Sequence, residues 1–291
     1  MGWRVVEISS RSKLELKMNY LVIRNETTKR IHLDEISVLI IDNTGCALTA
    51  SLLEALWKNK INVVFCDSKH NPGAQLLPLN CKYESNAELY SQLNWKQETK
   101  AIVWKEIVKD KITKQANNIK ESAPDSYLKL IEYSNSILPG DTTNREGQAA
   151  KVYFNHLFFH DFSRAEECIE NAALNYGYSI ILSSINRLIV ANGYSTQLGI
   201  FHKNTFNQFN LGCDLMEPFR PLVDLFVVKH IENELFDTEA KIKLVNILNF
   251  EVFIDGYKTT VLNAMQVYVK SILKALDEND ISLIKMFSYE F

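Results

Sequence analysis

Residues 94–120, NWKQETKAIVWKEIVKDKITKQANNIK, decide the fold class because a long helical repeat begins here. Side chains suited to a buried stripe recur at helical spacing: Trp104, Val108, Ile112, Gln115 and Ile119. From Lys96 to Lys120 there are seven lysines against three acids, an excess that usually marks a solvated face. Lys111 and Gln115 lie near the apolar stripe, so we predict that these two point inward, towards a site.

The chain before this helix has the pattern of a β-rich domain. The runs WRVVEI, KLELK, NYLVIR, SVLIID and INVVFCD are short, rich in branched side chains and separated by polar or turn-forming residues. TASLLEALWK, residues 49–58, interrupts them with helical spacing and a threonine at the expected N-cap. In SKHNPGAQLLPLN, residues 68–80, two prolines and a glycine predict an irregular segment.

The chain after residue 120 is predicted to be mainly helical. Helical patterns occur over residues 145–159, 165–192, 219–234, 239–249 and 258–277. VFIDGYKTT, residues 252–260, places an Asp-Gly turn between two short runs and predicts a small hairpin. We therefore predict an α+β protein with a small N-terminal β-rich domain, residues 1–85, followed by a larger all-α domain, residues 86–291.

Composition narrows the classes of protein. With 291 residues and 46% hydrophobic residues the chain can bury substantial cores, and a net charge of −3 argues against a uniformly basic surface but not against a basic groove. The first residues are too charged for a signal peptide, and no apolar run is long enough to span a membrane. Five scattered cysteines without a C-x-x-C pair argue against a disulfide scaffold or zinc knuckle. We expect a soluble, cytoplasmic protein.

A first candidate for chemistry is Glu146 in TTNREGQAAKVYFNHLFFHDF, residues 142–162. On a helix it shares a face with apolar or small side chains: Ala149, Ala150, Tyr153 and Leu157. A carboxylate on such a stripe is costly unless it is paired, hydrogen-bonded or bound to a metal. The alternative is a first-turn glutamate in a capping arrangement with Thr142 or Thr143.

A second candidate is His202 in LGIFHKNTFNQFN, residues 198–210. Amide side chains interleave after it with Phe206 and Phe209, beside Lys203, at Asn204, Asn207, Gln208 and Asn210. Such a mixture can grip a phosphate backbone or stack on bases. The alternatives are a structural histidine and a polar loop anchored by two core phenylalanines.

A third candidate is the pair Asp214 and Glu217 in GCDLMEPFRPLVD, residues 212–224. They lie one turn apart at the mouth of an apolar helix, whose start Pro218 and Pro221 restrict. They can be helix caps or metal ligands held on stiff backbone, and Arg220 between the prolines can face a phosphate or a carboxylate. One imidazole with two or three carboxylates suits Mg²⁺ or Mn²⁺ better than a structural zinc.

Together NREGQAAKVYF, FHKNTFNQFN and DLMEPFRPLVD resemble the three motif segments of the CRISPR-associated integrase of spacer acquisition, a metal-dependent endonuclease. The segments follow that family's order, and the resemblance covers nearly the whole chain, including GWRVVEISSRSKLELK and FCDSK. The version found in type II systems is the most similar. The three segments are specific together, whereas any one alone is a weak signal.

The resemblance implies the site residues position by position. The family's glutamate and histidine ligands match Glu146 and His202, and its third ligand, an aspartate or a glutamate, matches Glu217. These three are the implied catalytic residues and ligands of Mg²⁺ or Mn²⁺, and Asp214 matches an acidic position that supports the site. We expect DNA contacts from five side chains: Lys111, Arg145, Lys203, Asn207 and Arg220.

The resemblance also implies an activity and partners. The 3′-hydroxyl of a short DNA fragment attacks a phosphodiester at the end of a CRISPR repeat, by direct transesterification. The N-terminal domain serves in dimerisation, the helical domain is catalytic, and two homodimers are bridged by a small ferredoxin-like partner. Type II systems add the effector nuclease and a ring-shaped DNA-binding protein. Two other functions stay open from the residues alone: a metal-dependent phosphoesterase for a smaller substrate, and a non-catalytic DNA-binding scaffold.

Overall fold

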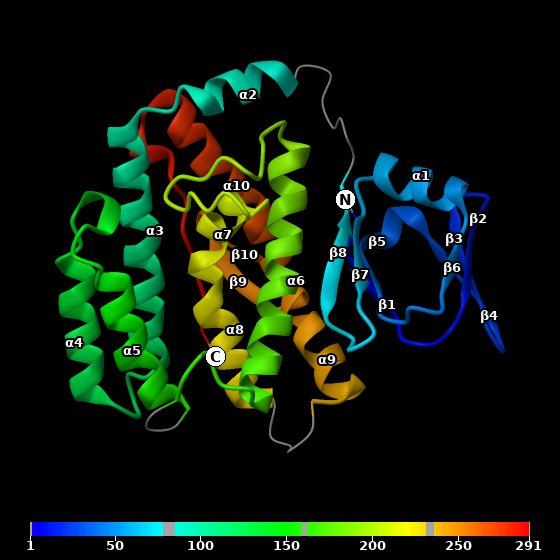
Figure 1. Cartoon of the computed structure of the whole chain (residues 1–291), viewed down its shortest axis with the longest axis horizontal. Coiled ribbons are helices and arrows are strands. Elements are labelled where there is room, and N and C mark those ends of the chain that lie inside the picture. Colours follow the sequence, from blue (N-terminus) through cyan, green and yellow to red (C-terminus); the bar gives the residue numbers. More distant parts are fainter. Residues whose placement is uncertain (1, 78–84, 159–161, 231–235, 291) are drawn as a thin grey trace.

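The computed structural model describes residues 2–77, 85–158, 162–230 and 236–290, in two parts of different secondary structure (Figure 1). The N-terminal part is built mainly of β-strands, and the rest is mainly helical. The predicted α+β class is therefore confirmed. The boundary predicted at residues 85 and 86 adjoins residues 78–84, which lie outside the described residues, and it stays a prediction.

The sheet that faces the helical part has the strand order β1-β5-β7-β8, with β1 Arg4–Ile8, β5 Ile36–Ile41, β7 Asn62–Cys66 and β8 Pro72–Leu76. The first three strands are parallel, and β8 is antiparallel to β7. All of β5 is buried, because its alternate side chains enter two different cores. Val38 and Ile40 belong to the core of the helical part, whereas Leu39 and Ile41 belong to the N-terminal core.

A second sheet covers the other side of that N-terminal core. Its order is β4-β3-β2-β6, with β4 Thr28–His32, β3 Tyr20–Arg24, β2 Lys13–Lys17 and β6 Ala47–Leu48. Helix α1, Ala50–Lys58, contributes Leu52 and Leu56 to the same core. The hydroxyl of Thr49 accepts a hydrogen bond from the backbone N–H of Leu52 at 3.3 Å, so the predicted N-cap is confirmed.

The helical part contains α2 Ser85–Leu93, α3 Gln97–Asn118, α4 Pro124–Asn135, α5 Arg145–Leu157, α6 Ile169–Ala191, α7 Asn210–Met216, α8 Arg220–His230, α9 Thr238–Val245 and α10 Val261–Glu278. The inward stripe predicted for α3 is confirmed, and Lys111 and Gln115 are buried with it. Helix α6 lies between the N-terminal sheet and most of the other helices (Figure 1). A Cβ at Gly177 would lie 2.5 Å from Val223, so a glycine lets α6 and α8 approach closely.

Polar contacts between the N-terminal sheet and α6 join the two parts. The Asn62 side chain of β7 donates to the hydroxyl of Ser183 at 3.2 Å. Gln75 of β8 donates to the Asn62 side-chain oxygen at 2.7 Å and to the Ser183 carbonyl at 2.6 Å. Within the described residues no helix combines the length and the apolar character needed to cross a membrane.

The predicted hairpin is present between α9 and α10. β9 Glu251–Ile254 and β10 Tyr257–Thr260 pair antiparallel, and β11 Phe287–Ser288 adds to β9. Asp255 and Gly256 both have positive φ, 54° and 79°, as a two-residue type I′ turn requires. The helix predicted over residues 258–277 therefore begins later, at Val261, because β10 takes its first residues.

Other expectations differ from the structure. The prediction of an irregular segment at residues 68–80 is wrong for β8, because a proline is tolerated at the first position of an edge strand. Strand β4 and helix α4 carry too few apolar side chains in a clear period to be recognised. The ends predicted for two helices, at residue 159 and residues 231–234, lie outside the described residues.

Candidate active site

Glu146 is held at the first turn of α5 by a buried aspartate. Asp141 accepts hydrogen bonds from the backbone N–H groups of Arg145 at 2.8 Å and Glu146 at 2.9 Å. Asn144 is the N-cap and accepts from Gly147 at 3.2 Å. The predicted alternative of a cap by Thr142 or Thr143 is therefore wrong. Because other residues satisfy the helix end, the Glu146 carboxylate is left to face the interior.

Asp214 and Glu217 lie along one nearly continuous helical path. Asp214 is inside α7, and Glu217 begins a 3₁₀ turn, Glu217–Phe219, that leads directly into α8. The expectation that both carboxylates open a helix is therefore wrong, since α7 begins four residues before Asp214 at Asn210. Pro218 has no N–H for the helical ladder, which accounts for the local change from α to 3₁₀ geometry. Both carboxylates are buried, with residue exposures of 0% and 3%.

Asp214 fixes the loop that carries His202. Its Oδ2 accepts the backbone N–H groups of Ile200 at 2.6 Å and Phe201 at 3.0 Å, and its Oδ1 accepts that of His202 at 3.1 Å. Oδ1 also lies 2.6 Å from His202 Nδ1. This hydrogen bond raises the pKa of His202 although burial opposes it, and the charges of Glu217 and Glu146 raise it further. The other ring nitrogen, Nε2, is thereby left for a ligand.

Trp104 of α3 packs against the loop that carries His202. The ring of Trp104 stacks on Phe201 with centroids 4.5 Å apart and planes 3° apart, and its edge meets His202 at 5.8 Å. Trp104 is 1% exposed, whereas His202 keeps 40% of its side chain open to solvent. The imidazole is therefore packed on one side and accessible on the other.

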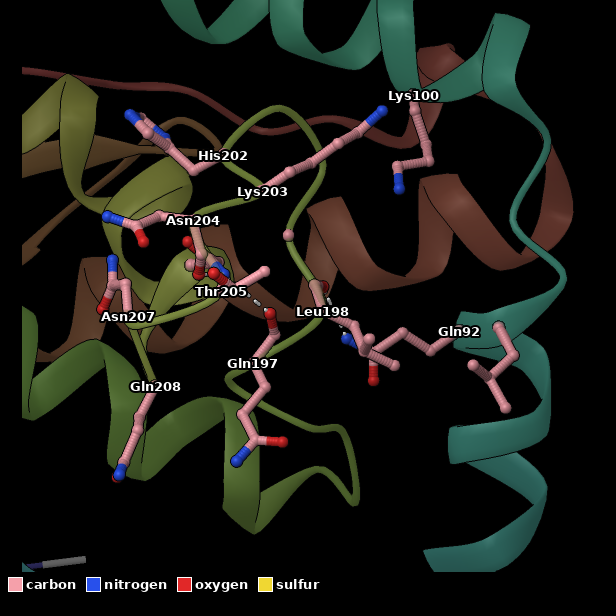
Figure 2. A pocket seen from close by; sticks show the side chains of 13 residues that line it. Gln92, Lys100, Gln197, Leu198, His202, Lys203, Asn204, Thr205, Asn207 and Gln208 are labelled. Atoms are coloured by element: carbon pink, nitrogen blue, oxygen red, sulfur yellow. Dashed lines mark hydrogen bonds between the residues drawn. The ribbon is translucent and has the colours of Figure 1, made fainter.

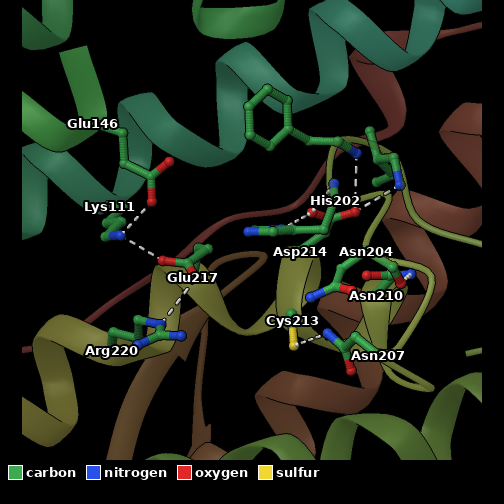
Figure 3. A network of polar contacts seen from close by, with 12 residues as sticks. Lys111, Glu146, His202, Asn204, Asn207, Asn210, Cys213, Asp214, Glu217 and Arg220 are labelled. Atoms are coloured by element: carbon green, nitrogen blue, oxygen red, sulfur yellow. Dashed lines mark hydrogen bonds and ion pairs between the residues drawn. The ribbon is translucent and has the colours of Figure 1, made fainter. Parts of the chain in front are cut away.

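The ammonium of Lys111 lies between the carboxylates of Glu146 and Glu217 and contacts both. Its ammonium donates to Glu146 Oε1 at 2.6 Å and also to Glu217 Oε2 (Figure 3). The guanidinium Nε of Arg220 lies 2.9 Å from the other oxygen of Glu217. Burial alone would lower the pKa of Lys111, but Glu217 and Glu146 outweigh it and raise that pKa. Burial likewise opposes the Glu217 charge, yet Arg220 and Lys111 hold the pKa of Glu217 below its usual value. Both shifts favour the charged forms of Lys111 and Glu217.

The side chains of Glu146, His202 and Glu217 offer atoms that suit a hard divalent cation. Their present spacing, however, is not that of a formed metal site. Two carboxylates and one imidazole supply oxygen and nitrogen ligands of the kind that Mg²⁺ and Mn²⁺ accept. Between the two carboxylates the structure already places a compact positive charge, the ammonium of Lys111. Among the described residues no three His, Cys, Asp or Glu side chains converge closely enough to hold an ion as they stand. The lysine ammonium occupies the intervening position.

The residues predicted to contact DNA have different surroundings. Lys203 is exposed, and Arg220 stacks on the ring of Tyr178 at 4.5 Å. Arg145 lies 5.0 Å from the ring of Tyr133 and donates to Gln148 at 2.8 Å. Lys111 is buried in its ion pairs.

Asn207 serves the loop internally. Its Oδ1 accepts the backbone N–H of Phe209 at 2.9 Å, and its Nδ2 donates to Cys213 Sγ at 3.4 Å. The alternative of two core phenylalanines is wrong for Phe206, which is 94% exposed at the tip of the loop.

A polar cleft of about 500 Å³ opens beside His202 (Figure 2). Lys100 of α3 and Lys203 both reach into it. Burial and the neighbouring Lys203 charge lower the pKa of Lys100. The cleft therefore concentrates positive charge next to the imidazole. Lys100 was not singled out from the sequence, since α3 carries many lysines and only the fold shows which one faces the cleft.

Asp224 is a buried residue that the sequence analysis also did not single out. It is fully buried, accepts a hydrogen bond from the hydroxyl of Tyr178, and lies on the same helical face as Arg220. Burial raises the pKa of Asp224 to about 7. The spacing of Glu217, Arg220 and Asp224 at three and then four residues was the signal available in the sequence.

Comparison with solved structures shows that the chain shares its whole fold with several of them. The chain aligns with a structure titled "Casposase bound to integration product" at a TM-score of 0.78, with 19% identity, covering 96% of this chain and 91% of that one. It aligns with a "Cas6-RT-Cas1--Cas2 complex" at a TM-score of 0.75, with 15% identity, covering 99% of this chain and 36% of that one.

Sequence comparison then gives the family. The family model described as "CRISPR associated protein Cas1" matches residues 6–248. The "CRISPR-associated endonuclease Cas1" of Neisseria meningitidis serogroup C (strain 8013) is 32% identical over 292 residues, covering 98% of this chain and 96% of that protein. The chain belongs to the Cas1 family. The family resemblance that the three motif segments indicate is thereby confirmed.

Proposed function

We propose that this protein joins a DNA 3′-hydroxyl to a phosphodiester at a CRISPR repeat, using a divalent cation held by Glu146, His202 and Glu217. As a member of the Cas1 family it is an endonuclease and integrase of CRISPR adaptation. The observation that carries the proposal for the site is the imidazole of His202, fixed by Asp214 and directed towards Glu217 (Figure 3).

The chemistry divides between the cation and the chain. A bound Mg²⁺ or Mn²⁺ activates an oxygen nucleophile and stabilises the charge that develops on a phosphoryl oxygen. His202 binds through Nε2 because Asp214 holds Nδ1, and Glu217 and Glu146 contribute oxygens. Arg220 fixes the Glu217 carboxylate from the side opposite Lys111.

The cleft beside His202 suits the path of a DNA strand. Lys100 and Lys203 place two positive charges there, and no ion-pair partner of either is found in the described part of the chain. Ammonium groups without a counter-ion favour phosphate, and the side chains of Gln197 and Gln208 add amide donors and acceptors to the same opening. We therefore add Lys100 to the DNA-binding residues predicted from the sequence, alongside Lys203.

The partners are proposed from the relatives. One structural neighbour is titled as a complex that contains Cas1 and Cas2, and the casposase structure is titled as bound to an integration product. For this chain we propose duplex DNA ends and the repeat as substrates, a homodimer formed through the N-terminal domain, and a small ferredoxin-like partner protein. The effector nuclease and the ring-shaped protein of type II systems are proposed as associates in capture.

Strand transfer in vitro tests the proposal. The protein and its small partner are mixed with a short duplex bearing 3′-hydroxyl ends and a plasmid carrying the repeat, with Mn²⁺ or with EDTA. We expect joining in Mn²⁺ and none in EDTA, and loss of joining in His202→Ala, Glu146→Ala and Glu217→Ala. Glu251→Ala is a matched control, since that glutamate is exposed in the β9–β10 hairpin.

Each alternative function predicts a different result. A scaffold that only binds DNA predicts that the Glu146→Ala and Glu217→Ala variants leave the joining of the reconstituted complex unchanged. A phosphoesterase for small substrates predicts turnover of nucleotides or simple esters without duplex ends. The first result would remove the proposed site assignment, and the second, in the absence of strand transfer, would overturn the proposed reaction.

A further inference from the structure

Lys111 is the one residue of the described chain that contacts both Glu146 and Glu217. Helix α3 carries it inward, and the residue is only 7% exposed. Its ammonium bonds to one oxygen of each carboxylate, at 2.6 Å for Glu146. These are the same two side chains to which a divalent cation is assigned above. The lysine and the cation therefore share their ligands.

Without a cation this pair of carboxylates would be unfavourable. Two negative charges that face each other with little access to water repel, and a buried charge without a partner is strongly destabilising. Arg220 meets only Glu217, on the oxygen that Lys111 does not use. Lys111 is thus the group that offsets the charge of Glu146 and keeps both carboxylates in position.

We propose that Lys111 is a built-in counter-ion that holds Glu146 and Glu217 in place until a divalent cation binds, and that withdraws when it does. The inference rests on the ligand set proposed above. Lysine suits this role because its ammonium is a compact charge on a flexible four-carbon stem, which can swing away without moving α3. Lys111 thereby lowers the affinity for the cation and prevents collapse of the empty site.

The exchange has a consequence for DNA. When a divalent cation replaces the Lys111 ammonium between the carboxylates, the positive charge at that position rises from one to two. The released ammonium then becomes available to a phosphate oxygen. The DNA contact predicted for Lys111 from the sequence is then conditional: it forms only after the lysine has left the carboxylates.

A second lysine on α3 provides a matched comparison. Lys114 is 6% exposed and is also paired with a carboxylate, that of Asp110. Its ammonium lies 3.3 Å from the centre of the Phe287 ring and contacts neither Glu146 nor Glu217. The two lysines share the same helix and a similar burial, but only Lys111 is at the proposed ligands.

Calorimetric titration of the full chain with Mn²⁺ tests the proposal. If the counter-ion is in place about 90% of the time, its removal tightens binding about tenfold. We therefore expect Lys111→Met to bind Mn²⁺ about tenfold more tightly than the wild type, and Lys114→Met to bind it with unchanged affinity. In EDTA, Lys111→Met should melt at a lower temperature than the wild type, and Mn²⁺ should recover more of its stability. Unchanged or weaker Mn²⁺ binding by Lys111→Met would overturn the proposal.

The ligand set is checked separately in the same titration. Mn²⁺ binding that is unaffected by His202→Ala and Glu217→Gln would remove the proposed site and, with it, the role of Lys111. Binding that depends on both residues, with no gain in Lys111→Met, would overturn only the counter-ion.

A measurement on the wild type covers the case in which Lys111→Met does not fold. Acetic anhydride labels accessible amines, and mass spectrometry locates the label. We expect Lys111 to be labelled several-fold more in Mn²⁺ than in EDTA, while Lys114 stays protected in both. Equal protection of Lys111 in the two conditions would contradict its withdrawal.

Discussion

Asp214 contacts both the imidazole ring and the backbone N–H of His202. Its Oδ1 lies 2.6 Å from the imidazole Nδ1 and accepts the backbone N–H of the same residue at 3.1 Å. The carboxylate is fully buried and accepts three successive backbone N–H groups, which hold it in one orientation. The tautomer and the direction of the His202 ring are therefore both set by one side chain.

We predict that Asp214→Asn lowers Mn²⁺ affinity and strand transfer about 10- to 100-fold, the usual effect of losing a group that orients a metal-binding histidine. The amide has one oxygen in place of two and carries no charge. The pKa of His202, followed by NMR, should fall, because the hydrogen bond that the imidazole donates to Asp214 is what raises it.

Asp280→Asn is the matched control for that substitution. Asp280 also accepts a backbone N–H, that of Ser282 at 2.9 Å, but it caps an exposed 3₁₀ turn outside the site. Strand transfer should be unchanged in this variant. Similar losses in both variants would mean that the effect of Asp214 is one of general stability.

The sequence singled out the segments of the candidate site, but not the contacts between them. Three segments suggested Glu146, His202 and Glu217, and the structure brings the loops and helices that carry them together. The predicted helix start at Asp214 is wrong, because the two prolines do not open a helix: the chain passes from α7 into α8 through a 3₁₀ turn. The bridging contacts of Lys111 depend on the packing of α3 against α5 and α8, which one sequence cannot show.

We predict that Trp104→Phe reduces strand transfer per folded molecule. Trp104 stacks on Phe201, the neighbour of His202, and its loss leaves that loop less well supported. In the described part of the chain nothing accepts a hydrogen bond from its Nε1, so the change loses packing but also removes a buried unpaired donor, and the net loss of unfolding free energy should be below about 2 kcal/mol. Chemical denaturation and the joining assay measure the two effects.

The Trp95→Phe variant is a control that distinguishes a loss of stability from a loss of support for the His202 loop. Trp95 also stacks, on Tyr194 at 5.8 Å, and in addition its Nε1 donates to Asp277 at 2.7 Å. Its substitution should cost at least as much stability as Trp104→Phe and leave joining by the folded fraction unchanged. An equal loss of joining would refute the special role of Trp104.

We predict that Lys100→Gln and Lys203→Gln each reduce the salt dependence of DNA binding. Each phosphate contact contributes about 0.9 to the log–log slope for duplex DNA and about 0.7 for a single strand. Fluorescence anisotropy at several salt concentrations measures the slope. Lys270→Gln, at an exposed position of α10 outside the cleft, should leave it unchanged. Slopes equal to that of the wild type in the cleft variants would exclude phosphate contacts there.

The fold was largely predictable where one physical signal dominated. The apolar stripe of α3, the Thr49 cap and the Asp-Gly hairpin all followed from local periodicity or turn chemistry. Strand β8 did not, because its pairing with β7 is a long-range property and its own residues resemble a turn. Lys100 is a similar case, since its partner in the cleft comes from a loop about a hundred residues further along the chain.

The last prediction concerns Glu7, which lies on β1 where the N-terminal sheet meets the helical part. Burial, and then the charge of Asp42, raise its pKa from 4.5 to about 7, although Lys241 and His70 act in the opposite direction. In the described residues its Oε1 is buried without a hydrogen-bond partner. The folded protein therefore favours the protonated carboxyl.

The sign of the pH dependence follows. Below about pH 4.5 both folded and unfolded chains are protonated at Glu7, and the group has no effect on stability. Between that pH and about 7 the folded state alone keeps the proton, so this contribution to stability falls as pH rises. Glu7→Gln should thus gain stability relative to the wild type between pH 5 and pH 8.5, on the order of 1–2 kcal/mol after allowance for solvent screening. Urea denaturation at both pH values measures the difference, with Glu26→Gln as an exposed control. A difference that is constant with pH, or that favours the wild type at high pH, would show that Glu7 is ionised in the folded protein throughout this range.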